Sequence, residues 1–247
     1  MPTKDTYERI IWSADVTDDA VLLSKLQQIG HPIRVKIDRL RVRRNGDAIF
    51  GAINDAGHQV FNDAKLVEIP SKLAELAEEE IKRTRPWMLN CMAGSLSNGL
   101  GNLEQTSKHD GLKQFANICL KNDVLPCAVT VLTSKTDDMA RAEFNSEAVD
   151  QVLFYAHWLV KFGFTDMVCS PKEAAIIRQD STFDSLSLNT PGVRMPGDAV
   201  GDQARVATPG QAIRDGVNRV VIGRPITGSD DPLATIEAIA CDIEAAV

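Results

Sequence analysis

The stretch Asn62-Asp63-Ala64-Lys65-Leu66-Val67-Glu68-Ile69-Pro70 follows directly on an apolar, strand-like segment and carries three closely spaced charges. Because side chains alternate between the two faces of a strand, Asp63 and Lys65 point to the same side. The turn after the strand can bring Glu68 close to them, or close to the same site in a partner subunit. Burying such groups costs several kcal/mol unless opposite charges compensate each other. The stretch therefore predicts a catalytic site at the end of this strand.

Seven more apolar runs of strand length occur along the chain. The eight predicted strands cover residues 9–16, 33–37, 58–63, 87–92, 125–132, 166–169, 185–189 and 218–222. Segments with helical periodicity lie between them, at 18–29, 71–84, 148–162, 171–178 and 208–215, and Gly30, Gly57, Gly163 and Gly216 are placed to end helices. Strand, helix and turn repeated eight times predict an α/β fold, a (β/α)8 TIM barrel in which residues 1–247 form a single domain.

A doubly wound open sheet is the alternative architecture. It usually has fewer strands, and the Gly-rich dinucleotide turn after its first strand is missing here. The Gly- and Ser-rich stretch at 94–101 lacks the Lys-Ser/Thr ending of a phosphate loop, so we expect an ordinary loop after the fourth strand. Segments 135–144 and 194–202, after the fifth and seventh strands, are predicted to be mobile loops.

The composition argues against several classes of function. The net charge of −7 and the lack of a long basic tract argue against nucleic acid as a partner. The first residues contain no apolar signal region, and no stretch approaches the roughly 18 apolar residues of a membrane span, so we expect a cytoplasmic protein without a membrane partner. Five widely spaced cysteines, mostly in apolar runs, are typical of reduced core thiols. Zinc-type spacing is missing and the four histidines are scattered, so no metal site built from protein ligands alone is expected.

Charged residues recur where the predicted strands end. Asp15 ends the first strand, Lys36 and Asp38 the second, Asp63 and Lys65 the third, and Gly223-Arg224 the eighth. In a barrel these ends meet at one mouth, where catalytic groups are found. A single such charge would more simply be a solvated rim residue or half of a stabilising ion pair. Several charges that converge on one mouth favour an active site.

A second group of motifs follows the seventh and eighth strands. It comprises Thr190-Pro191-Gly192-Val193-Arg194, Gly201-Asp202-Gln203 and Ile222-Gly223-Arg224-Pro225-Ile226-Thr227. Loops at these positions commonly form the phosphate site of such barrels, through backbone N–H groups and arginine. The motifs therefore predict a phosphorylated substrate. The alternative is that Gly192 and Gly223 only make tight turns while Arg224 faces water.

Taken together, these motifs resemble the orotidine 5'-phosphate decarboxylase family, and the resemblance spans nearly the whole chain. It rests on the 63–70 stretch and on the three phosphate motifs. Supporting pieces are Ala14-Asp15, Val35-Lys36-Ile37, Ala128-Val129-Thr130-Val131-Leu132-Thr133-Ser134, and Val168-Cys169-Ser170 followed by Glu173-Ala174. The Asp-x-Lys-x-x-acid motif alone also fits sugar-phosphate relatives in the same superfamily, whereas the Thr-Pro-Gly-x-Arg and Gly-Asp-Gln pieces point to the orotidylate branch.

The resemblance implies a homodimeric barrel with shared active sites that converts orotidine 5'-monophosphate to uridine 5'-monophosphate and CO2, the last step of de novo pyrimidine synthesis, without cofactor or metal. It implies that Lys65 stabilises the carbanion formed at C6 and protonates it, that Asp63 lies close to the substrate carboxylate, and that Lys36 pairs with the acids and touches the ribose. The other implied contacts are Asp15 with ribose hydroxyls, Ser134 with the pyrimidine amide edge, and Arg194, Gln203, Gly223 and Arg224 at the phosphate.

Two residues depart from the family pattern in the shared part of the site. Glu68 stands where a second Asp is usual, contributed across the dimer interface, and Lys72 stands where a Thr is expected. Glu68 adds a methylene, and a misplacement of about 1 Å can cost on the order of a hundredfold in rate. Met92 also occupies a position where many members carry His. Two other hypotheses stay open: a metal-dependent sugar-phosphate decarboxylase or aldolase relative, and a catalytically weak nucleotide-binding protein.

Overall fold

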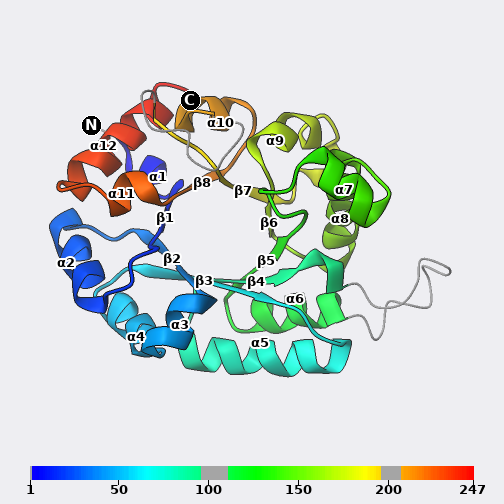
Figure 1. The fold of residues 1–247 in the computed structure, drawn as a ribbon, viewed down its shortest axis with the longest axis horizontal. Helices are drawn as coiled ribbons and strands as arrows, with labels where there is room; N and C mark the ends of the chain where they lie inside the picture. Colours follow the sequence, from blue (N-terminus) through cyan, green and yellow to red (C-terminus); the bar gives the residue numbers. More distant parts are fainter. Residues whose placement is uncertain (1, 96–110, 196–206) are drawn as a thin grey trace.

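Eight parallel strands form a closed barrel in the computed structural model, which describes residues 2–95, 111–195 and 207–247. The strands are β1 (Ile10–Ser13), β2 (Arg34–Asp38), β3 (Gln59–Leu66), β4 (Met88–Met92), β5 (Leu125–Val129), β6 (Asp166–Val168), β7 (Ser187–Pro191) and β8 (Arg219–Ile222). Each strand pairs with its neighbours in sequence, and β8 closes the barrel by pairing with β1. Helices surround this ring of strands, and the two chain ends lie near each other on its outside (Figure 1). The predicted TIM barrel is confirmed.

The connections between strands are mostly helical. The helices are α1 (Lys4–Tyr7), α2 (Asp19–Ile29), α3 (Arg39–Asn45), α4 (Ala48–Asp55), α5 (Pro70–Thr84), α6 (Gly111–Lys121), α7 (Asp137–Phe144), α8 (Ala148–Phe162), α9 (Pro171–Ile177), α10 (Pro209–Arg214), α11 (Arg224–Thr227) and α12 (Pro232–Glu244). The five predicted helices are all present, with ends within one residue of the prediction. Local chemistry sets these ends: the Asp18 side chain accepts the N–H of Ala20 at the start of α2, and Gly30 ends that helix in the left-handed conformation.

The prediction of a loop over 135–144 is wrong, because α7 occupies most of this segment. The Thr136 side chain accepts the N–H of Met139 and so caps the first turn, where Asp137 and Asp138 also favour the helix. Ala140 is buried against the neighbouring elements. Of the other two predicted loops, residues 96–101 and 196–202 lie outside the described residues, and Gly94 belongs to a short 3-10 turn at 93–95.

Two apolar layers hold the barrel together. The inner cluster fills the barrel itself and consists of Ile11, Phe61, Met88, Cys127, Val129, Val168 and Val221. The alternate strand residues, such as Trp12, Val60 and Leu89, point outwards and pack under the helices in a much larger core. Because side chains alternate along each strand, every second residue is available to the interior. At the carboxyl ends of the strands, the interior positions become polar, and this change creates the mouth of the barrel.

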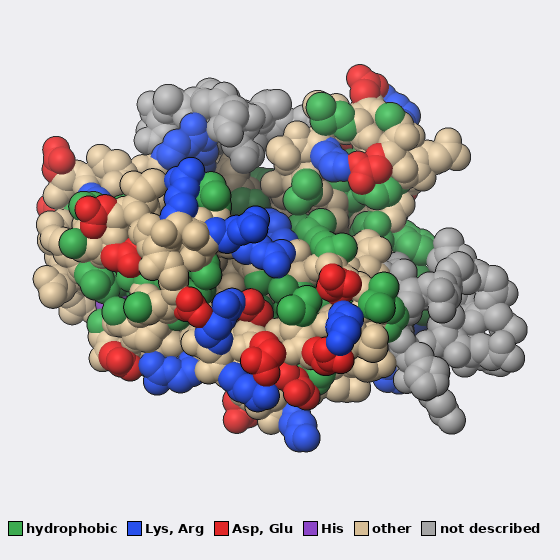
Figure 2. All heavy atoms as spheres, turned by 60° about the horizontal axis from the view of Figure 1, so that its bottom comes forward, with side chains coloured by type: hydrophobic (Ala, Val, Ile, Leu, Met, Phe, Trp, Pro, Cys, Tyr) green, Lys and Arg blue, Asp and Glu red, His purple; other side chains and the backbone are tan. Residues whose placement is uncertain are grey.

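Helix α5 shows how the outer layer is built. Its inward face carries the buried residues Leu73, Ala77 and Ile81, at the spacing of one helical stripe. Its outer face carries ion pairs between side chains three residues apart, including Lys82 with Glu79 at 3.2 Å. Figure 2 brings the α5 side of the molecule forward and shows acidic and basic side chains mixed along it. The helix therefore packs against β3 and the neighbouring helix α6, and it meets water with its charges.

Four of the five cysteines are buried, as the sequence predicts, but Cys241 on α12 is exposed. Burial raises the pKa of the Cys169 thiol to about 12, so this thiol stays protonated at neutral pH.

None of the helices in the described ranges combines the length and the apolar character that crossing a bilayer requires.

Helix α10 should depend on Gly210, where it packs against α12. A Cβ at this position would lie 2.4 Å from the main-chain oxygen of Asp242, and the Gly210 N–H also donates to the Asp242 carboxylate at 2.7 Å. We expect Gly210→Ala to lower the free energy of unfolding by about 1–3 kcal/mol, measured by urea denaturation, because backbone must move to admit the methyl group. Gly51→Ala is the matched control in α4, where the nearest atom beyond its own helix is 3.8 Å from the added Cβ, and it should be neutral or stabilising. Equal losses in both variants would contradict this account.

Candidate active site

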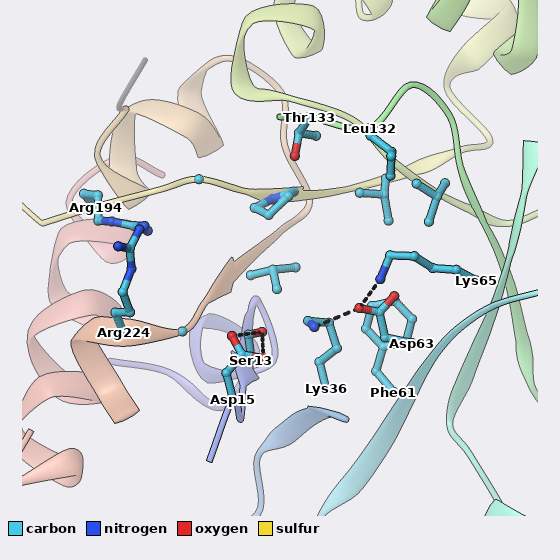
Figure 3. A pocket seen from close by; sticks show the side chains of 16 residues that line it. Ser13, Asp15, Lys36, Phe61, Asp63, Lys65, Leu132, Thr133, Arg194 and Arg224 are labelled. Atoms are coloured by element: carbon cyan, nitrogen blue, oxygen red, sulfur yellow. Dashed lines mark hydrogen bonds and ion pairs between the residues drawn. The ribbon is translucent and has the colours of Figure 1, made fainter. Parts of the chain in front are cut away.

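A pocket of about 530 Å³ opens at the carboxyl ends of the strands, within the size range of small-molecule sites. The residues that line it are Ser13, Asp15, Lys36, Phe61, Asp63, Lys65, Val129, Leu132, Thr133, Val168, Pro191, Gly192, Arg194, Val221, Gly223 and Arg224 (Figure 3). Its floor is the top of the inner cluster, and its walls come from β1, β2, β3, β5, β6, β7 and β8 and the residues that follow them. Of the ten residues predicted to act at the site, seven line this one pocket.

Asp63, Lys36 and Lys65 form a charge cluster at one end of the pocket. The Oδ2 atom of Asp63 lies 2.8 Å from the Nζ atom of Lys36 and 2.6 Å from the Nζ atom of Lys65. The side chains of Asp63 and Lys36 are 7% and 14% exposed, whereas that of Lys65 is 41% exposed. Lys36 comes from β2 and the other two residues from β3. The cluster therefore places one accessible ammonium group at the pocket and pairs it with a buried carboxylate (Figure 3).

The two buried members of the cluster keep their charges. Burial would raise the pKa of Asp63, but Lys36 and Lys65 outweigh it and hold that pKa well below its ordinary value. Burial would lower the pKa of Lys36, but Asp63 and Asp15 outweigh it and leave that pKa raised. A carboxylate between two ammonium groups is favourable in an interior of low polarity, where charge interactions are strong. The site is therefore preorganised in its ionised form at neutral pH.

A distortion of β3 allows this geometry. The pairing of β3 with β4 shifts register between Asn62 and Leu66, which marks a β-bulge. Within the bulge Lys65 has a φ of +45°, a left-handed conformation that is strained for a residue with a side chain. The Asn90 side chain on β4 stabilises it, because its Oδ1 atom accepts the main-chain N–H of Lys65 at 2.7 Å. The bulge re-aims the Lys65 side chain towards Asp63.

Asp15, which follows β1, lies beside Gly223 on the same side of the mouth. The Ser13 hydroxyl donates to the Asp15 carboxylate at 3.2 and 3.3 Å. A Cβ at Gly223 would lie 3.3 Å from an Asp15 carboxylate oxygen and 3.4 Å from the Ser13 main-chain oxygen, so a side chain there would press on both. Gly223 thus keeps this wall open for a ligand and for the Asp15 carboxylate.

Arg194 and Arg224 lie at the other end of the pocket from the charge cluster, and their side chains point towards each other (Figure 3). Arg194 is buried, and its guanidinium donates to the Val193 main-chain oxygen at 2.8 Å. Gly192 precedes it with a φ of +81°, in the left-handed region that favours glycine. Two guanidinium groups at one end of a pocket suit a doubly charged group such as a phosphate.

Three predicted site residues lie elsewhere or cannot be placed. Ser134 lines a neighbouring pocket of about 420 Å³ and not the main one. Leu132 and Thr133, which precede it, line both pockets. Glu68 is exposed just beyond β3, and its carboxylate accepts the N–H of Ile69 at 3.1 Å. Gln203 lies outside the described residues.

Lys72 turns away from the pocket. Its ammonium lies 2.5 Å from the Glu75 carboxylate, on the exposed face of α5. Lys72 is therefore a surface residue with a partner on its own helix.

Several pocket residues were not predicted from the sequence. Ser13, Phe61, Val129 and Val168 line the cavity because of their place in the alternation along the strands, and Thr133 lines it from the turn after β5. Asn90 does not line the pocket but holds Asp63 and Lys65 from behind. The available signal was period-two alternation: each of Ser13 and Phe61 lies two residues from a predicted site residue on the same strand face.

The charge cluster predicts a specific dependence of stability on pH. Asp63→Asn should lower the free energy of unfolding at pH 7 by about 3 kcal/mol, because it leaves the buried Lys36 without its anion. The folded-state pKa of Asp63 is lowered, so its stabilising effect is complete above the unfolded pKa of about 3.9 and is lost as the pH falls towards the folded value. The difference between wild type and variant should therefore shrink below about pH 4. Urea denaturation between pH 7 and pH 3 measures it.

Asp55→Asn provides the control, because Asp55 pairs with Arg85 on the surface at 3.0 Å and is mostly exposed. It should change stability by less than about 1 kcal/mol at any pH in the same range. A difference for Asp63→Asn that does not vary with pH would contradict the ionised cluster.

Comparison with known proteins agrees with this geometry. The family model described as "Orotidine 5'-phosphate decarboxylase / HUMPS family" matches residues 8–239. An orotidine 5'-phosphate decarboxylase of Actinobacillus pleuropneumoniae serotype 5b is 34% identical over 237 residues, 95% of this chain and 98% of that protein. One of Haemophilus influenzae (strain ATCC 51907) is 34% identical over 233 residues, 94% of this chain and 96% of that protein. The crystal structure of orotidine 5'-phosphate decarboxylase from Lactobacillus acidophilus superposes with a TM-score of 0.77 at 25% identity, covering 96% of this chain and 99% of that one. The chain belongs to the orotidine 5'-phosphate decarboxylase / HUMPS family.

Proposed function

We propose that this protein decarboxylates orotidine 5'-monophosphate to uridine 5'-monophosphate and CO2, in the cytoplasm, as a step of de novo pyrimidine synthesis. The observation that carries the proposal is a single pocket with a Lys–Asp–Lys cluster at one end and two arginines at the other. A nucleoside monophosphate has the matching polarity, with a base to be reacted at one end and a dianionic phosphate at the other. Curated relatives with this name at 34% identity support the same reaction.

The chemistry needs an ammonium group at the reacting carbon. The bond between C6 and the carboxylate breaks, its electron pair stays on C6, and CO2 leaves. Lys65 then transfers a proton from Nζ to C6, and solvent restores the proton to the amine. An ammonium held next to Asp63 in a preorganised site stabilises the developing negative charge before the transfer is complete. Lys65 suits this role because it is the accessible lysine of the cluster.

Asp63 contributes through its charge. In the proposed complex its carboxylate faces the carboxylate of the substrate, and the repulsion between them disappears as CO2 departs. Lys36 compensates Asp63 throughout, since it pairs with the same oxygen atom as Lys65 does. In this proposal Lys36 also touches the ribose, and Asp15 accepts hydrogen bonds from the ribose hydroxyls.

The remaining contacts hold the two ends of the nucleotide. Arg194 and Arg224, with backbone N–H groups at Gly223 and with Gln203, bind the phosphate. Ser134 bonds the amide edge of the pyrimidine, which requires the segment after β5 to bring it from the neighbouring pocket into the main one. Phosphate binding far from the reacting carbon can supply the free energy for such a rearrangement.

The first experiment is to treat the protein with EDTA, add orotidine 5'-monophosphate, and follow the loss of orotate absorbance with chromatographic confirmation of the product. We expect the wild-type protein to convert the substrate without metal. Lys65→Ala should lower kcat by about a thousandfold or more and leave the affinity for uridine 5'-monophosphate nearly unchanged. Lys82→Ala, which removes an exposed lysine on the outer face of α5, should behave as wild type.

Other outcomes identify the alternatives. Nucleotide binding without turnover would indicate a catalytically weak binding protein, and activity towards a sugar phosphate that depends on a divalent metal would indicate the other branch of the superfamily. Substantial residual activity in Lys65→Ala would exclude Lys65 as the proton donor.

We further propose that the active enzyme is a homodimer in which Glu68 completes the site of the partner subunit. Val67 and Ile69, which flank Glu68 in the sequence, are 60% and 62% exposed. Such exposure is unusual for two large apolar residues close together at the edge of a pocket. A second subunit that covers them would bury both and bring Glu68 to a neighbouring mouth. Glu68 does not line the pocket of its own subunit, which fits a role across the interface.

Hybrid dimers test this arrangement. Lys65→Ala and Glu68→Ala should each be inactive or severely impaired, but in a hybrid one of the two sites has both residues intact. Random exchange makes half the dimers hybrid, so an equimolar mixture should recover about a quarter of wild-type activity. The control is a mixture of Lys65→Ala with Lys36→Ala, which should recover nothing, because both lysines come from the same subunit as Asp63. Failure to recover activity after verified subunit exchange would argue against a shared site.

A further inference from the structure

Asn90 lies behind the charge cluster, with no exposed surface, on the face of β4 that points into the barrel. Its side-chain amide acts both as a hydrogen-bond donor and as an acceptor. The Nδ2 atom donates to the Oδ1 atom of Asp63 at 2.6 Å, and the Oδ1 atom accepts the main-chain N–H of Lys65 at 2.7 Å. One side chain thus holds both ends of the Asp-x-Lys motif.

These two hydrogen bonds act on different degrees of freedom. Both ammonium groups bind the Oδ2 atom of Asp63. The hydrogen bond from Asn90 to the other oxygen, Oδ1, therefore fixes the rotation of the carboxylate about the Cβ–Cγ bond of Asp63. The second bond holds the strained backbone of Lys65, whose φ is +45°. Without the Asn90 side chain, the main-chain N–H of Lys65 would lose this acceptor. The bulge would then lose a contact that stabilises its backbone conformation.

We propose that Asn90 is a positioning residue of the active site, which sets the orientation of the Asp63 carboxylate and the backbone conformation from which Lys65 reaches the substrate. The inference rests on the proposed function for its kinetic test. Asn90 itself does not line the pocket, so it acts through Asp63 and Lys65 and not by contact with the substrate.

At neutral pH the Asn90 amide meets both demands, because it carries a donor and an acceptor without a charge. A carboxylate of the same shape could accept from Lys65 but could not donate to Asp63, and two carboxylates at 2.6 Å cannot both be ionised without a large penalty. An aliphatic side chain would leave both a buried N–H and a carboxylate oxygen without this partner. Substitutions at position 90 can therefore distinguish loss of the hydrogen bond to Asp63 from loss of the hydrogen bond to Lys65.

Asn90→Asp tests the role through its pH profile. The introduced carboxyl would face Asp63 and Lys65 on β3, Lys36 on β2 and the Cys127 thiol, which is opposite on β5. When it is protonated it can still donate to Asp63, so activity should be restored at low pH and lost as the pH rises and the pair gives up its proton. At pH 8 we expect kcat to be lower than wild type on the order of a hundredfold, with KM changed less than about threefold.

Asn189→Asp is the matched control. Asn189 is also fully buried on a strand that faces the barrel interior, and its Nδ2 atom donates to the Oδ1 atom of another buried aspartate, Asp166, at 2.9 Å. Neither Asn189 nor Asp166 lines the pocket or contacts the charge cluster in the bonds of this pair. The control should lose stability without losing kcat or changing the pH profile. If Asn90→Asp matches wild type in kcat and pH profile, or shows only what Asn189→Asp shows, the proposal is wrong.

A second measurement separates this proposal from the proposed function. If the wild-type protein does not turn over orotidine 5'-monophosphate, the proposed function fails, and hydrogen exchange at the Lys65 amide then decides the role of Asn90. Asn90→Ala should accelerate that exchange by about tenfold or more, while Asn189→Ala should leave it unchanged. Unchanged exchange at Lys65 in Asn90→Ala would overturn the proposal, whether or not the protein is active.

Discussion

The carboxylate of Asp63, buried between two ammonium groups, is the interaction on which the site depends. A single buried anion would be strongly unfavourable, and so would two adjacent lysines without it. Together the three groups compensate one another: the Asp63 carboxylate raises the pKa of Lys36, and the two ammonium groups lower the pKa of Asp63. The cluster therefore stores a preorganised electrostatic field at the mouth of the barrel. Any reaction that develops negative charge next to Lys65 can use that field without first reorienting water.

The barrel supplies the geometry that this cluster needs. Three neighbouring strands, β2, β3 and β4, contribute Lys36, Asp63 and Asn90 respectively. Lys36 pairs with Phe61, two residues before Asp63, and its long side chain reaches the Asp63 carboxylate at 2.8 Å. The inner cluster below them is apolar, so the lower side of the charges meets no solvent and their mutual attraction stays strong. On the opposite wall, Arg194 and Arg224 follow β7 and β8. The same fold thus separates a reacting end from an anion-binding end across one cavity.

Much of this arrangement was predictable from local patterns. All eight strands and five helices follow from apolar runs, periodicity and caps, and the charges at strand ends predicted a common mouth. The prediction of a loop over 135–144 failed because α7 has only a short apolar face, and the Thr136 cap and the acidic first turn stabilise it instead. Ser134 was predicted from a motif alone, and a motif does not reveal to which of two adjacent pockets the residue belongs. Glu68 was predicted at the site, but in the single chain it is exposed and lies outside the pocket, between the exposed apolar residues Val67 and Ile69.

The sequence by itself determined the barrel and the identity of the charged residues, because period-two and helical patterns are local and the Asp-x-Lys spacing puts two charges on one strand face. Only the tertiary structure decided how these residues meet. The 2.6 Å contact between Asp63 and Lys65 occurs at a bulge where Lys65 has a left-handed backbone. The main-chain N–H of Lys65 donates there to Asn90, which is 25 residues away in the chain. No local pattern records such a contact, because it depends on the register between two strands. That register is set by the closing of the whole barrel.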